Sequence, residues 1–141
     1  MKKVYIASDH AGFTLKEQIK KKFANVINII DLGTDNSTTS VNYPSYAHQL
    51  CKKVSLDNKN IGILVCGSGM GMSMAANRHK KIRAALCYSV LNTKLSRLHN
   101  NSNVITLGAR LIKKELAFKC INVFLKTPFE SGRHLKRVKK I

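Results

Sequence analysis

The segment most able to do chemistry is residues 66–71, a Cys-Gly-Ser-Gly-Met-Gly stretch that follows the apolar run 61–65. Glycines let backbone N–H groups approach a ligand, and a helix that begins there favours negative charge. The spacing matches neither the Walker motif nor the dinucleotide-binding motif, so nucleotide binding gains little support. The segment instead suits a thiolate base at Cys66 that removes a proton next to a carbonyl, while the turn stabilises the resulting enediolate. The alternative is a buried structural cysteine.

Carboxylate and imidazole groups stand side by side after another apolar run, at residues 4–7. Asp9 and His10 lie within Ser-Asp-His-Ala-Gly, and together they suit a substrate that offers a hydroxyl group and a phosphate oxygen. The alternative for Asp9 is a cap on the helix that follows. A second imidazole, His99, lies in an Asn-rich segment. It suits proton transfer on a sugar ring oxygen near neutral pH, or else it is a surface histidine.

The carboxyl-terminal tail carries the remaining candidate residues. Arg133 and Arg137 are four residues apart, so on a helix both would lie on one face and hold a phosphate from two directions. A solvated basic tail is the alternative. His48 and His79 have no partner pattern in the sequence, and we assign them no role.

The elements that must position these residues follow from an alternation of short apolar runs and amphipathic stretches. Strands are expected at residues 4–7, 26–32, 61–65, 82–86 and 104–107, and helices at 14–23, 44–54, 67–77, 89–98 and 113–126. This alternation is typical of one parallel sheet covered by helices on both faces. We predict a single domain over 1–141, a three-layer α/β/α, Rossmann-like fold with a five-stranded parallel sheet and a C-terminal basic tail or helix. Ligands of such sheets bind at the carboxyl ends of the strands.

Composition excludes several classes of protein. The 141 residues, 44% hydrophobic and 23% charged, suit one globular domain. No apolar run reaches the roughly 18 residues of a membrane span, and the first residues do not resemble a secretory signal. We therefore expect a cytoplasmic protein with no membrane contact. The four cysteines form no CxxC pair and no zinc-finger spacing, so we expect free thiols in a reducing compartment and no metal site.

The excess of positive charge raises one alternative to an enzyme, a protein that binds nucleic acid. A formal net charge of +18 would attract any polyanion, so a nucleic-acid-binding module must be considered. The cations are mostly scattered, however, and no aromatic residues interleave with them as on a stacking platform for single strands. We expect no specific nucleic acid partner. The positive field would also attract phosphorylated small molecules.

Taken in order, the segments resemble one family. The motifs are the stretches at 8–12, 31–34, 43–44, 66–71, 75–77, 96–100, 108–110 and 129–134. They are similar to those of the B-type ribose-5-phosphate isomerases, whose superfamily also holds the two galactose-6-phosphate isomerase subunits. The resemblance spans the chain from Val4 to its last residue.

The resemblance implies an activity and a mode of assembly. It implies a metal-independent, cofactor-free aldose–ketose isomerase that interconverts D-ribose 5-phosphate and D-ribulose 5-phosphate through a cis-enediolate, in the non-oxidative branch of the pentose phosphate pathway. The implied assembly is a homodimer, possibly a tetramer, whose active sites draw residues from two subunits. Within the class, a hexose 6-phosphate of the allose or galactose type is the alternative substrate. In galactose-6-phosphate isomerase the catalytic residues are divided between two different subunits, whereas this one chain holds the whole set. This difference favours the pentose.

The resemblance also implies a role for each motif residue. Cys66 would carry the proton between the two carbons, and His99 would open the furanose ring with help from Asp9 and Tyr43. The enediolate would be stabilised by the loop of Gly67, Ser68, Gly69, Met70 and Gly71. The substrate phosphate would be bound by His10, Arg110, Arg133 and Arg137, and a sugar hydroxyl by Asn100. Among these, the residues expected from the partner subunit are His99, Asn100 and Arg110. Some family members place a glutamate base just after the loop, where this chain has Met72.

Overall fold

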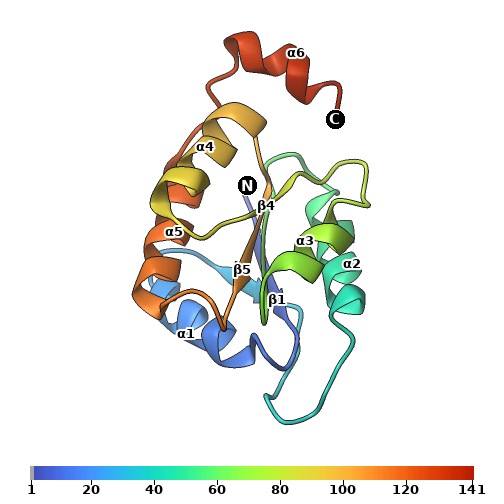
Figure 1. The fold of residues 1–141 in the computed structure, drawn as a ribbon, viewed down its shortest axis with the longest axis vertical. Helices are drawn as coiled ribbons and strands as arrows, with labels where there is room; N and C mark the ends of the chain where they lie inside the picture. Colours follow the sequence, from blue (N-terminus) through green and yellow to red (C-terminus); the bar gives the residue numbers. More distant parts are fainter. Residues whose placement is uncertain (1) are drawn as a thin grey trace.

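Five parallel strands form the centre of the computed structural model, which describes residues 2–141 (Figure 1). The strands are β1 (Val4–Ser8), β2 (Ile29–Asp31), β3 (Ile61–Cys66), β4 (Ala84–Leu86) and β5 (Val104–Gly108). Their order across the sheet is β2-β1-β3-β5-β4, and every neighbouring pair is parallel. All strands therefore end at the same edge, and the loops after β1, β3 and β5 lie next to one another.

Helices cover both faces of this sheet. They are α1 (Phe13–Phe23), α2 (Tyr43–Val54), α3 (Met70–Ala76), α4 (Val90–Asn100) and α5 (Lys114–Lys126). Figure 1 shows α1, α4 and α5 on one side and α2 and α3 on the other. Side chains of a strand point alternately to its two faces. Accordingly Ile63 and Val65 pack in the core beneath α1 and α5, whereas Leu64 and Cys66 pack in the core beneath α2 and α3.

The predicted fold class is confirmed, with differences at the ends of elements. The strand predicted at 26–32 is too long, because the N–H groups of Val26 and Ile27 donate to the Phe23 carbonyl and extend the turn that closes α1. The helix predicted from residue 67 begins only at Met70, since Gly69 adopts a left-handed conformation with φ +78°.

The basic tail folds into two short turns. A 3₁₀ turn, η1 (Gly132–His134), leads into the short helix α6 (Leu135–Val138). The N–H of Glu130 donates to the carbonyl of Leu98 on α4, and Figure 1 shows α6 beyond the end of α4. The tail therefore lies at the edge of the sheet where β5 begins. Among residues 2–141, no helix combines the length and the apolar character needed to cross a lipid bilayer.

Candidate active site

The turn after β3 directs a backbone N–H group at a thiol. Cys66 is the last residue of β3, pairs with Gly108 at the end of β5, and is buried. The N–H of Gly69 donates to Cys66 Sγ at 3.2 Å, and the N–H of Met70 donates to Ser68 Oγ at 3.2 Å. The left-handed φ of Gly69 makes this turn possible at no steric cost. This N–H is therefore placed to hydrogen-bond the sulfur of Cys66, and a cysteine accepts a proton only as its thiolate.

A pocket of about 350 Å³ opens beside this thiol. This volume suits a small ligand. Its walls come from the ends of three strands and the start of α2, and they consist of Asp9, Tyr43, Cys66, Gly67, Ser68, Gly71, Arg110 and Leu111. The pocket therefore gathers predicted residues from four separate segments. Leu111 was not predicted, and its apolar type carried no chemical signal.

Two glycines allow polar side chains into this pocket. A Cβ atom at Gly71 would lie 2.5 Å from Cζ of Tyr43, and one at Gly67 would lie 3.0 Å from Nη1 of Arg110. Any larger residue would therefore displace the phenol or the guanidinium. The expectation that Arg110 comes from a partner subunit is wrong for this pocket, because Arg110 follows β5, the neighbour of β3.

Asp9 and His10 are both held by backbone N–H groups. Asp9 is 6% exposed, and its Oδ1 accepts from the N–H of Gly12 at 2.9 Å, so this carboxylate lines the pocket and also supports the start of α1. The Nδ1 atom of His10 accepts from the N–H of Val41 at 3.2 Å. This bond leaves the proton of a neutral His10 ring on Nε2. His10 is not among the lining residues; it holds the loop before α2.

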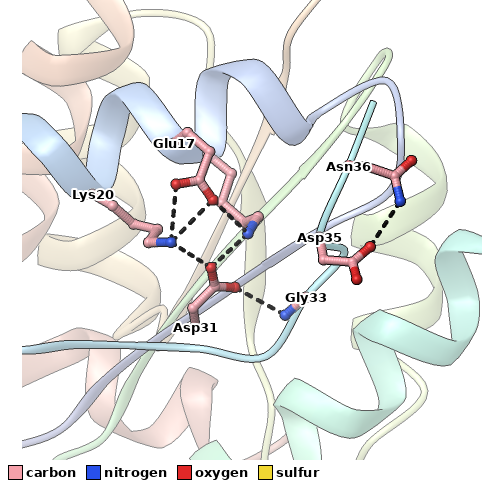
Figure 2. Close-up of polar contacts among 7 residues, drawn as sticks. Glu17, Lys20, Asp31, Gly33, Asp35 and Asn36 are labelled. Carbon is pink, nitrogen blue, oxygen red and sulfur yellow. Dashed lines mark hydrogen bonds and ion pairs between the residues drawn. The ribbon is translucent and has the colours of Figure 1, made fainter. Parts of the chain in front are cut away.

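An ion pair between a buried lysine and a partly exposed aspartate lies next to the segment that carries Asp9. Lys16 Nζ, on a side chain only 1% exposed, donates to Asp31 Oδ2 at 2.6 Å. Lys20 Nζ lies at 2.6 Å from the same oxygen, while Asp31 Oδ1 accepts from the N–H of Gly33 at 2.9 Å (Figure 2). The Gly33 carbonyl in turn accepts from the N–H of Ser8 at 2.7 Å. Asp31 therefore connects the lysines of α1 to the residue that precedes Asp9.

The charge of Asp31 depends on these partners. Burial acts to raise the pKa of its carboxyl, but hydrogen bonds from Lys16, Lys20 and the Gly33 backbone outweigh burial and hold the pKa below its ordinary value. A carboxyl with a lowered pKa in the folded state stabilises the fold above its unfolded pKa. That contribution is lost as the pH falls through the folded pKa, below about pH 4.

We expect Asp31→Asn to lower the free energy of unfolding by about 3 kcal/mol, because it leaves the buried Lys16 ammonium without its main partner. Lys20→Met is the matched control, since Lys20 contacts the same oxygen from a side chain 32% exposed. Its cost should be at most about 1 kcal/mol. Urea denaturation at neutral pH measures both values, and equal losses in the two variants would contradict the assignment. At acidic pH, where the carboxyl of Asp31 itself becomes protonated, the free energy of unfolding of Asp31→Asn should differ less from that of the unsubstituted protein.

Four predicted residues lie far from this pocket within one chain. His99 and Asn100 end α4, just before β5 begins, and Arg133 and Arg137 lie in the tail beside them. Cys66 instead pairs with the last residue of β5, a strand that spans roughly 15 Å. A single chain therefore does not bring His99 or these arginines to the thiol.

Two groups of histidines became visible only in the structure. His99 and His134 stack with ring centroids 4.2 Å apart, and Glu130 Oε2 lies 3.9 Å and 4.0 Å from their Nε2 atoms. Burial and the neighbouring His99 lower the pKa of His134. The spacing of Glu130 and His134, four residues, was the signal that could have revealed this group. His48 and His79 are also partners, with ring nitrogens 2.7 Å apart.

The family model and the similar proteins that follow are all sugar-phosphate isomerases. The family model described as Ribose/Galactose Isomerase matches residues 4–141. The ribose-5-phosphate isomerase B of Escherichia coli is 39% identical over 100% of this chain and 95% of its own. A ribose 5-phosphate isomerase structure from Thermotoga maritima has a TM-score of 0.94 at 47% identity, covering 98% of this chain and 95% of that one. The Mycoplasma genitalium ribose-5-phosphate isomerase B with bound ribulose-5-phosphate has a TM-score of 0.94 at 39% identity, covering 99% and 93%.

Proposed function

The chain belongs to the ribose/galactose isomerase family, and we propose that it interconverts ribose 5-phosphate and ribulose 5-phosphate with Cys66 as the proton-carrying base. It is an aldose–ketose isomerase, the reaction class of the relatives named ribose-5-phosphate isomerase B. The observation that carries the assignment of the base is the N–H of Gly69 directed at Cys66 Sγ, at the wall of the pocket. Met72, at the position of the alternative glutamate base, has no ionisable group.

The proposed reaction moves one proton between two carbons. The Cys66 thiolate removes the proton from carbon 2 of the open-chain aldehyde, and the electron pair shifts toward the carbonyl oxygen to form an enediolate. The same thiol then returns the proton to carbon 1, while a proton passes from the oxygen on carbon 2 to the oxygen on carbon 1. Backbone N–H groups of the 67–71 loop and the Ser68 hydroxyl would stabilise the negative oxygen. No oxidant or reductant is consumed.

A second copy of the chain would complete the site. Ring opening requires an imidazole near the ring oxygen, and His99 of the same chain lies at the other edge of the sheet. We propose a homodimer in which the end of α4 and the tail of one subunit reach the pocket of the other. His99 and Asn100 would then contact the sugar. Arg133 and Arg137 would bind the phosphate together with His10 and Arg110.

The remaining proposals concern substrate and compartment. Arg110 and the predominantly positive chain suit a phosphorylated sugar, and the pentose remains our choice over an allose or galactose 6-phosphate. We assign the activity to residues 1–141 as one domain. The four buried thiols, none of them in a disulfide within the described residues, suit the reducing cytoplasm. No nucleic acid partner is proposed.

The test is a coupled assay of metal-stripped protein in EDTA. We expect turnover of ribose 5-phosphate well above that of allose 6-phosphate and galactose 6-phosphate. Higher turnover of a hexose phosphate would mean that the substrate is a hexose 6-phosphate, while the assigned reaction class would be unchanged. A folded dimer that converts none of the three would contradict the proposed function, and salt-dependent nucleic acid binding would then be measured next.

A further inference from the structure

Three potential metal ligands gather where the tail meets α4. His99, on the last turn of α4, Glu130 and His134 each offer a ligand atom, and these atoms lie within 4.8 Å of one another. Two imidazoles and one carboxylate form a ligand set that zinc accepts while keeping a further position open. The tail and α4 are joined there by the Glu130–Leu98 backbone hydrogen bond, which holds the ligand-bearing segments together.

His134 has an unsatisfied nitrogen in this group. Its side chain is 7% exposed, and its Nε2 atom is buried with no hydrogen-bond partner among residues 2–141. A buried polar atom without a partner costs free energy, so it marks a place where a ligand would be stabilising. Glu130 Oε2 lies 4.0 Å from this nitrogen.

We propose that His99, Glu130 and His134 form a site for a divalent transition-metal ion such as zinc, and that occupation of this site inhibits the isomerase. The inhibition rests on the proposed function, because His99 is the residue assigned to ring opening. A metal bound to Nε2 of His99 would take the lone pair needed for proton transfer. The binding itself does not depend on the enzyme's activity.

The ligands need only a small adjustment to bind one ion. Bonds of about 2.0–2.2 Å in a tetrahedral site place ligand atoms roughly 3.3 Å apart, against 3.9 and 4.0 Å here. Glu130 is 52% exposed in the segment before η1, and His99 is 36% exposed, so both can rotate toward the more buried His134. Arg133 and Arg137 face this group from the tail, and their charge weakens the binding of a cation.

The binding test uses calorimetric titration of zinc chloride into the Cys66→Ala variant at neutral pH. Removing Cys66 excludes the active-site thiol as a ligand and makes the measurement independent of turnover. We expect one zinc ion per chain, with affinity at least about tenfold weaker in Glu130→Gln and His134→Gln. Glu130 is exposed, so its variant should fold even if His134→Gln does not.

The second histidine pair supplies the matched control. His48 and His79 approach as closely as ligands do, at 2.7 Å, but no carboxylate completes the pair among the metal-ligand groups of the described residues. His79→Gln should leave zinc affinity unchanged. No zinc binding, or loss of binding in His79→Gln but not in Glu130→Gln, would overturn the proposed site.

The inhibitory role is measured with the unsubstituted enzyme. Zinc should slow the use of ribose 5-phosphate more than that of ribulose 5-phosphate, which is acyclic because its 5-hydroxyl is phosphorylated. EDTA should reverse the effect, and Glu130→Gln should reduce the fractional inhibition relative to its own rate without zinc. Binding without inhibition would overturn the inhibitory role. An enzyme that converts no ribose 5-phosphate at all would contradict the proposed function, while calorimetry would still decide the metal site.

Discussion

Cys66→Ala should reduce the rate of isomerisation by about 10²- to 10⁴-fold, the usual contribution of a positioned acid or base. Alanine fits the space of the thiol but accepts no proton, so enediolate formation loses its base. The groups expected to bind the phosphate and the sugar are untouched, and substrate affinity should therefore stay close to its original value. Steady-state kinetics and equilibrium binding of ribose 5-phosphate measure the two quantities separately.

Cys51→Ala is the control for loss of a buried thiol. Cys51 lies in α2 within the core, and burial raises the pKa of its thiol to about 12, so it stays protonated and inert. This variant should keep the original kcat even if it unfolds more easily. Appreciable turnover by Cys66→Ala, or an equal loss of kcat in both variants, would refute the assignment of the base.

A mixture of two inactive variants should recover activity. If Cys66 of one subunit works with His99 of the other, a mixed dimer of Cys66→Ala and His99→Asn contains one fully intact site and one doubly damaged site. Random association makes half of the dimers mixed, so about a quarter of the original activity should return. The two variants are unfolded together, refolded and assayed with ribose 5-phosphate.

The comparison with unmixed samples makes this result decisive. Each variant refolded alone should remain inactive toward ribose 5-phosphate, because all of its sites lack one group. Native mass spectrometry establishes that mixed dimers have formed. Mixed dimers without recovered activity would contradict the shared site.

The sequence by itself determined the order of elements and the chemistry of the main loop. The apolar run before Cys66 is buried along its whole length, and such a run predicts a central strand without any knowledge of its neighbours. The glycines after Cys66 predict a tight turn, because few other residues allow that backbone. Both properties are local, so the sequence carries them directly. The predicted start of the second strand was wrong, because turn hydrogen bonds continue from the end of α1 to Val26 and Ile27.

Only the tertiary structure decided which distant side chains meet. The order β2-β1-β3-β5-β4 places Arg110 beside Cys66 in the same chain, although 43 positions separate them, and no periodicity specifies that order. The same applies to His99 with His134 and to His48 with His79, which meet because separate helices and loops pack together. Such contacts depend on the three-dimensional path between elements. A pattern along the chain records spacing, whereas a site requires proximity in space.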